Sequence, residues 1–166
     1  MNGRIGRAIG VMLLGIFLEG CETYKPYANP GVPLPTLKRV AVMTSPNSKE
    51  KARRAEDIWK VLEKRGIEAV IVPPGDAPPK DVDGYFTYTD NWQWDLTMYL
   101  AELQIELHEP QTGRLLASAS YKQSWVHRYP NPIDIVDNLI GQILGEPPKK
   151  PERDAEAPEN RDLIKH

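Results

Sequence analysis

The stretch 38-KRVAVMTSPNSKEKARRAEDIWKVLEKRGIEAVIV-72 decides the fold of this chain. Its two ends are short, valine-rich apolar runs, which are typical of buried strands. Between them, over residues 49–65, apolar side chains recur on one stripe and charged side chains lie opposite, which predicts an amphipathic helix. Gly66 follows where glycine commonly ends a helix. This order predicts two parallel strands joined by a right-handed crossover.

The sequence after this unit predicts an antiparallel sheet. Three further strands are predicted at residues 85–89, 94–108 and 115–124, with turn residues at Asp90-Asn91 and a hairpin loop at 109–114. The later part of the 94–108 strand alternates apolar and polar residues, so one of its faces is predicted to be buried. Its first residues are apolar in the opposite phase. That pattern predicts either cover on both faces or a β-bulge that switches the phase.

The last predicted element is a helix over residues 133–144, because Asn131-Pro132 is a strong helix start and the apolar residues that follow form one stripe. The complete predicted order is β-α-β-β-β-β-α. It indicates an α/β (α+β) two-layer sandwich in which both helices pack on one face of a mixed sheet.

Composition divides the chain into four parts. Residues 1–20 have the pattern of a lipoprotein signal peptide. Residues 21–36 contain four prolines and are predicted to form an extended, Pro-rich tether. Residues 37–145 are predicted to fold as a single α/β domain. Residues 146–166 are rich in proline and charge, which predicts a disordered tail.

The N-terminus predicts export and lipid anchoring. Two arginines precede the apolar run 8–18, which is too short to span a bilayer because a spanning helix needs about 20 apolar residues. Cys21, the only cysteine of the chain, follows directly after Leu18-Glu19-Gly20. Apart from the charged Glu19, this tetrapeptide resembles a bacterial lipobox, which implies cleavage before Cys21 and acylation of its thiol with chains such as palmitate. The alternative is an ordinary signal peptide with an unrelated cysteine.

Charge and residue inventory exclude several function classes. The formal net charge is −2, with no basic cluster of the kind that binds nucleic acid. There is no Gly-x-Ser-x-Gly motif, and His108, His127 and His166 have no second ligand at metal-binding spacing. Because the single thiol is assigned to the lipid, the sequence predicts a protein that is not an enzyme, with no cofactor and no metal site.

An aromatic cluster is the main candidate for a binding surface. Its members are Tyr88, Trp92, Trp94 and Tyr99. Trp92 and Trp94 point to the same side of an extended segment, and aromatic side chains provide large amphipathic contact area for a glycan or a protein. The alternative is that these side chains close the core. Trp94 is expected to be the more buried indole, because it opens the long strand.

The same segment carries a family resemblance. The stretch 87-TYTDNWQWDLTMYL-100 resembles the T-Y-T-x-N-W-x-W-D-x-x-x-Y-[ML] core of the Sbal-type family, a group of small uncharacterised Gram-negative lipoproteins. In that family the core continues into an alternating strand, a hairpin, a further strand and a final helix, which here correspond to segments between residues 101 and 144. The resemblance covers about residues 39–144. It implies an envelope localisation and this fold, and no assigned activity.

These observations lead to one expected function. The chain is expected to be a lipoprotein anchored to the outer membrane through acyl chains on Cys21, facing the periplasm, since Glu22 after the cysteine fits the outer-membrane sorting pattern. It is expected to act as a non-enzymatic binding or envelope-assembly module with an envelope protein or a glycan as partner. The alternative is a glycan- or peptidoglycan-binding lipoprotein that uses the Trp/Tyr hairpin.

Overall fold

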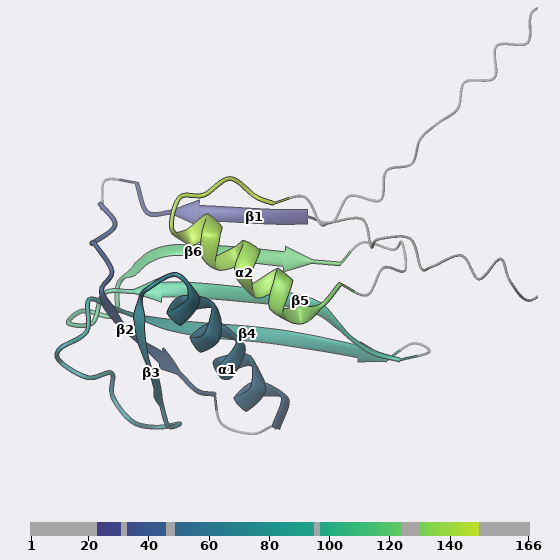
Figure 1. Cartoon of the computed structure of the whole chain (residues 1–166), viewed down its shortest axis with the longest axis horizontal. Coiled ribbons are helices and arrows are strands. Elements are labelled where there is room, and N and C mark those ends of the chain that lie inside the picture. Colours follow the sequence, from purple (N-terminus) through teal and green to yellow (C-terminus); the bar gives the residue numbers. More distant parts are fainter. Residues whose placement is uncertain (1–22, 31–32, 46–48, 95–96, 124–129, 150–166) are drawn as a thin grey trace, which may run out of the picture.

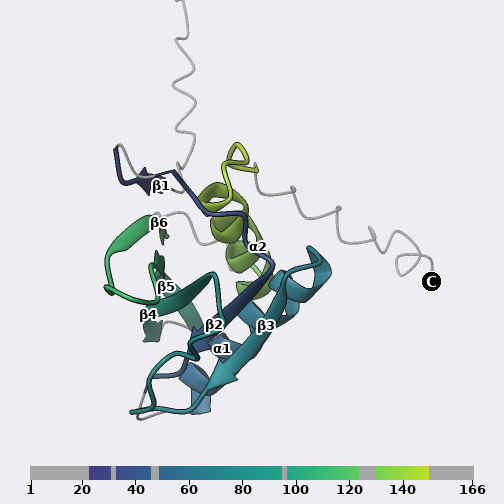
Figure 2. The same cartoon turned by 90° about the vertical axis from the view of Figure 1, so that its left-hand side faces the viewer.

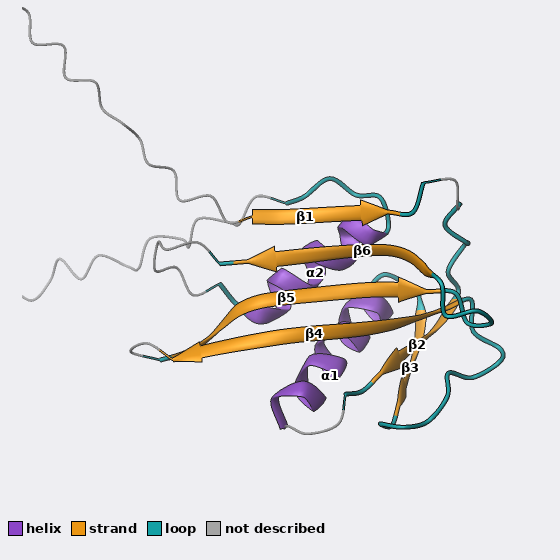
Figure 3. Ribbon diagram, turned by 180° about the vertical axis from the view of Figure 1, so that it is seen from behind, coloured by secondary structure: helices purple, strands orange, loops and turns teal. Residues whose placement is uncertain are grey.

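The computed structural model describes residues 23–30, 33–45, 49–94, 97–123 and 130–149. Within them, strands form one six-stranded mixed sheet in the order β1-β6-β5-β4-β2-β3, and two helices cover one of its faces (Figures 1 and 3). The predicted α+β class, with both helices on one face of a mixed sheet, is confirmed. The elements are β1 (Thr23–Ala28), β2 (Arg39–Met43), α1 (Lys49–Lys64), β3 (Glu68–Val72), β4 (Gly84–Trp94), β5 (Met98–His108), β6 (Leu115–Lys122) and α2 (Pro132–Ile143).

The β2-α1-β3 unit forms as the sequence predicts. β2 and β3 pair in parallel along their whole length, and Gly66 adopts a φ of 76° just after α1. β2 is covered on both sides: Val40 and Val42 belong to the core between the sheet and the helices, whereas Ala41 packs with Val82 in a smaller cluster. This two-sided cover explains why β2 is a continuous apolar run rather than an alternating one.

β4 and β5 form a long hairpin, and one prediction about it is wrong. The turn predicted at Asp90-Asn91 does not form, because β4 continues to Trp94 and Asp90 pairs with Leu103 on β5. The Asp90 carboxylate instead accepts a hydrogen bond from the indole Nε1 of Trp92 at 3.0 Å. The carboxylate of Asp90, which suggested a turn, is therefore hydrogen-bonded within the strand.

A β-bulge resolves the mixed pattern of the long strand. Asn91 pairs with Glu102, but the next residue, Trp92, pairs with Leu100, so Ala101 is an extra residue on β5. The extra residue switches the phase, and both Leu100 and Ala101 are buried. Of the two explanations that the sequence allowed, the bulge is confirmed.

The N-terminal boundary of the domain differs from the prediction. Part of the predicted 21–36 tether is strand β1, which pairs antiparallel with β6 from Thr23 to Ala28. The ring of Tyr24 lies 5.3 Å from that of Tyr121, which adds an aromatic contact to the backbone pairing. Pro26 is tolerated because an edge strand has one side without ladder partners. Because proline is rare inside strands, the four prolines of residues 21–36 indicated a tether instead of β1.

The C-terminal boundary also lies further along the chain. The predicted domain ends at residue 145, but the side chain of Asn138 on α2 makes two hydrogen bonds with the backbone of Lys149. Asn138 Nδ2 donates to the Lys149 carbonyl (2.8 Å), and Asn138 Oδ1 accepts from the Lys149 N–H (3.0 Å). Arg65 also pairs with Glu146. The folded part therefore reaches Lys149, while the rest of the predicted tail and the signal peptide with Cys21 lie outside the described residues.

The two helices lie side by side on the sheet (Figure 2). Between them, Arg65 Nη2 donates to the side chain of Asp137 (2.8 Å) and to its carbonyl (2.9 Å), which links the end of α1 to α2. None of the helices in the described segments has the length and hydrophobicity needed to cross a membrane.

Candidate functional site

The four predicted aromatic residues do not form one surface. Tyr88 is 7% exposed and belongs to the core, and Trp92 is half-buried against the same core. Trp94 is 69% exposed, so the expectation that it is the more buried indole is wrong. The hydroxyl of Tyr99 donates to Gln93 Oε1 (3.0 Å), its cross-strand partner. Leu100 points toward the helices, so the neighbouring Tyr99 lies on the other face of the sheet, opposite to Trp92 and Trp94.

Trp92 is held by a buried group of charges that we call the Arg54 cluster, defined by Arg54, Asp57, Asp90 and Trp92. Arg54 is 1% exposed, and its Nη1 donates to Asp57 Oδ2 at 2.6 Å. Its Nε lies 3.9 Å from Asp90 Oδ2, and its guanidinium carbon lies 5.5 Å from the centre of the Trp92 ring. One face of that indole is therefore occupied by a cation from α1.

Burial dominates the electrostatics of the Arg54 cluster. Burial lowers the pKa of Arg54, while Asp57 and then Asp90 act in the opposite direction. Burial likewise raises the pKa of Asp57, against the attraction of Arg54. These charges pair with one another inside the protein. Arg54 was missed in the sequence, although its spacing to Ile58 and Val61 places it on the apolar stripe of α1.

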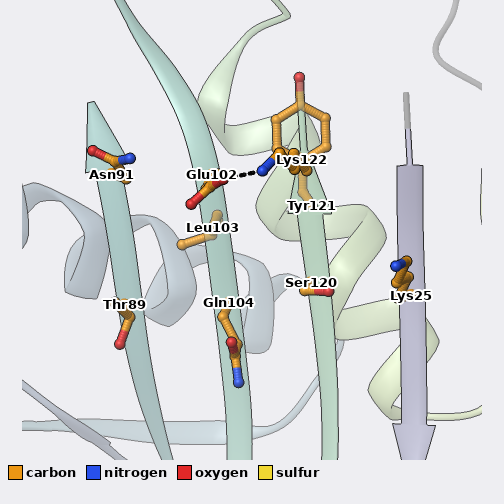
Figure 4. A pocket seen from close by; sticks show the side chains of 9 residues that line it. All are labelled: Lys25, Thr89, Asn91, Glu102, Leu103, Gln104, Ser120, Tyr121 and Lys122. Atoms are coloured by element: carbon orange, nitrogen blue, oxygen red, sulfur yellow. Dashed lines mark ion pairs between the residues drawn. The ribbon is translucent and has the colours of Figure 1, made fainter. Parts of the chain in front are cut away.

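The face of the sheet opposite the helices is polar over β1, β6, β5 and β4, and we call this surface the open face. It contains a shallow concavity of about 310 Å³ whose lining comes from all four strands (Figure 4). The polar residues that line it are Lys25, Thr89, Asn91, Glu102, Gln104, Ser120 and Lys122. Strand alternation and the register of the four strands bring them together, which no single segment of sequence indicates.

Two of the three charged residues that line this concavity form an ion pair. Lys122 Nζ lies 2.7 Å from Glu102 Oε1, and Figure 4 shows the two side chains meeting across β5 and β6. The hydrogen bond from Lys122 lowers the pKa of Glu102. Lys25, on β1, adds a second amine to the lining.

The residues of the concavity are suited to binding a polar partner. Its amides and hydroxyls both donate and accept hydrogen bonds, so they can satisfy a polar ligand or a protein surface. The lining includes neither histidine nor cysteine, and so offers no nucleophile–base pair of the Ser–His or Cys–His kind. In the part of the chain that the structure describes, no three His, Cys, Asp or Glu side chains could hold a metal ion.

His108 lies outside the concavity, near the 109–114 hairpin. Its ring stacks on Tyr85 (centroids 5.0 Å apart, 12° between planes), and its Nε2 lies 3.0 Å from Thr87 Oγ1. His127, His166 and the predicted lipidation site Cys21 lie outside the described residues.

Comparisons with known proteins identify the fold alone. No protein-family profile matches the chain, and no curated protein matches it either. Solved structures of the PelC dodecamer from Paraburkholderia phytofirmans are similar in fold. A single-residue variant of PelC is 15% identical, with a TM-score of 0.51, over 75% of this chain and 95% of the PelC chain. A second PelC structure gives 13% identity and a TM-score of 0.49 over the same shares.

Proposed function

We propose that this chain is a lipid-anchored envelope protein that binds or assembles with other components through the open face and catalyses no reaction. The observation that carries the proposal is the position of β1. This strand begins two residues after Cys21 and contributes Lys25 to the concavity. The proposed anchor is therefore only two residues away in sequence from a strand that helps to form the proposed binding surface.

Two further observations support the proposal. The lining of the concavity combines amides, hydroxyls and charges of both signs, which suits a polar partner. The segment 87–100 resembles the core of the Sbal-type lipoproteins, and membership of that family is part of the proposal. Glu22 after Cys21 favours the outer membrane, with the domain facing the periplasm. Since PelC forms dodecamers, a second copy of this chain is included among the partners to be tested.

Glycan binding by the aromatic hairpin has less support. Tyr88 is in the core, and Arg54 occupies one face of the Trp92 ring. Trp94 and Tyr99 lie on opposite faces of the sheet, so the aromatic residues provide no common stacking platform. A glycan partner would have to use the hydrogen-bonding groups of the open face instead.

The anchor is tested by labelling in a Gram-negative host. We expect the wild-type chain to incorporate radiolabelled palmitate, to lose residues 1–20 and to fractionate with the outer membrane. Cys21→Ser should lose the label and the membrane fractionation. A Cys21→Ser chain that is processed and sediments as the wild type does would contradict the anchor.

The open face is tested by site-specific photo-crosslinking in the same cells. A photoreactive residue replaces Gln104, an exposed residue of the concavity, or, as the control, Glu56, an exposed residue of α1 on the other side of the molecule. We expect adducts from position 104 and few from position 56. The mass of the adduct distinguishes an envelope protein, a glycan and a second copy. Equal yields from both positions would contradict a binding role for the open face.

A further inference from the structure

The β4–β5 hairpin ends in exposed apolar side chains that the open face does not explain. Trp94 is 69% exposed and Met98, its cross-strand partner, is 53% exposed. Together with the exposed Thr97 between them, they define what we call the hairpin tip. Two large apolar side chains side by side in water suggest a contact with an apolar or interfacial partner.

The register of the sheet shows which end of the molecule carries the tip. Thr23 pairs with Lys122, Lys122 with Glu102, and Glu102 with Asn91, so these four residues form one row across β1, β6, β5 and β4. β4 runs antiparallel to β1, and Trp94 comes three residues after Asn91. The tip therefore projects about 10 Å beyond the row, on the side from which the chain enters β1 (Figures 1 and 3).

Chain length places the lipid at the same end. Cys21 is two residues before Thr23, so it lies within about 7 Å of that residue whatever path the chain takes. Across the sheet, β1 and β4 are three strand spacings apart, which is about 14 Å. A bilayer that holds acyl chains on Cys21 is thus within reach of the hairpin tip.

We propose that the hairpin tip is a membrane-contacting element that inserts Trp94 and Met98 into the headgroup region of the bilayer that carries the lipid anchor. This inference rests on the proposed lipid anchoring. Tryptophan suits that depth, because its ring is apolar and its N–H can meet water or headgroups. The projection of the tip matches the depth of about 5–10 Å to which interfacial side chains are buried.

A second feature continues the apolar surface inward from the tip. A hollow of about 280 Å³ lies beside the tip. Its lining combines the apolar residues Trp92, Met98, Leu100, Pro130 and Pro132 with Tyr99 and the polar residues Thr97, Gln123 and Asn131. The apolar character of this end of the domain is thus not confined to two side chains. The open face in contrast is polar, so the molecule presents different chemistry to the bilayer and to its partner.

Insertion of the tip determines orientation. Acyl chains alone hold a protein at the membrane but leave it free to tilt, whereas a second contact about 14 Å away fixes its direction. The strands then run away from the membrane, and the concavity, centred on the rows of Asn91 and Thr89, stands close to the bilayer surface. A partner of the open face would therefore be met at the membrane.

The experiment uses the full-length, processed lipoprotein in vesicles of phosphatidylethanolamine and phosphatidylglycerol. Since the natural thiol is acylated, Thr97→Cys provides a single labelling position at the tip, and Gln111→Cys provides a matched exposed position in the hairpin at the opposite end of the sheet. Each carries an environment-sensitive fluorophore. We expect emission at position 97 to move to shorter wavelength and to be quenched by brominated lipids, with neither effect at position 111.

The outcomes separate the tip from the anchor. If the protein floats with the vesicles but the fluorophore at position 97 emits as it does in water, the tip contact alone is overturned. Failure to float overturns the anchor and, with it, the tip contact. If the emission from position 97 moves to shorter wavelength without vesicles, and does so more at higher protein concentration, the tip contacts a second copy of the chain. That result also overturns the inference. Trp94→Ala combined with Met98→Ser should abolish the shift without loss of flotation. Trp59→Ala, which removes an exposed indole of α1 beside the edge strand β3, should preserve it.

Discussion

Trp92 and Trp94 are two residues apart on the same side of β4, and they belong to regions that differ in nearly every physical respect. The Arg54 cluster around Trp92 is charged and mostly buried beneath α1, whereas Trp94 and Met98 at the hairpin tip are apolar and exposed. The difference comes from the cover, because β4 extends past the helices that shield its earlier residues. Identical side chains on one strand can therefore serve stability in one place and contact in the other.

Removing the cation of the Arg54 cluster should have the largest effect. Arg54→Met leaves Asp90, whose side chain is 2% exposed, as a buried charge without its cation. Breaking such a network by removing one partner costs about 3–5 kcal/mol of unfolding free energy. Urea denaturation measures this loss of unfolding free energy. The control is Arg53→Ala, on the exposed side of α1, whose unfolding free energy should stay within about 0.5 kcal/mol of the wild-type value. A loss below about 1 kcal/mol for Arg54→Met would show that the cluster is not stabilising.

The two tryptophans allow the comparison to be made directly. Trp92→Ala should lower the unfolding free energy by about 2–3 kcal/mol, somewhat less than for a fully buried indole, because the side chain is half-buried. Trp94→Ala should change it by less than about 0.5 kcal/mol. Thermal and chemical unfolding of both variants provides the measurement. Similar losses for the two variants would mean that the hairpin tip is packed against the domain.

The link between α2 and residues 146–149 is a half-exposed network that lies between these extremes. Truncation after Gly145 removes both hydrogen bonds between Asn138 and Lys149 and the pair of Arg65 with Glu146. At about 1 kcal/mol for each hydrogen bond, the domain should lose about 1–2 kcal/mol. A chain that ends after Lys149 is the control and should match the full length. An unchanged melting temperature for the shorter chain would restore the predicted boundary at residue 145.

Replacement of Asp137 should lower the unfolding free energy by less than the truncation does, and its effect should depend on pH. Burial raises its pKa, but hydrogen bonds from Lys149 and Arg65 outweigh burial and hold the pKa below the ordinary value. A carboxylate with a lowered folded-state pKa stabilises the protein above the unfolded-state pKa of about 3.9 and loses that contribution as the pH falls through the folded-state value. Asp137→Asn should therefore cost under about 1 kcal/mol at pH 7. The difference from the wild type should vanish in unfolding curves recorded at progressively lower pH below 4, and a difference that stays constant would exclude this linkage.

The candidate site shows where prediction from sequence ends. The residues of the 87–100 motif predicted strands on either side of a turn at Asp90-Asn91, but β4 continues through that turn to Trp94. They also predicted that Trp94 is the more buried indole, which is wrong because the burial of a side chain depends on how far the helices reach along β4. The concavity of the open face went unpredicted, because Lys25, Gln104 and Ser120 come from three strands whose order is set by pairing. Arg54 had a signal, its place on the apolar stripe of α1, which a reading of residue type alone overlooks.

Local chemistry by itself determined much of this protein. Periodicity and end signals predicted the two helices, the parallel β2-α1-β3 unit and the existence of three strands after it, because each depends on residues close in sequence. They left the bulge near Ala101 as one of two explanations of the mixed pattern. The tertiary structure alone decided that residues 23–28 join the sheet, that residues 146–149 pack on α2, and that Trp92 is covered while Trp94 is not. Each of these depends on a partner far along the chain, such as β6 for β1. Whether a backbone edge or a side chain finds such a partner is determined only when the whole sheet has formed.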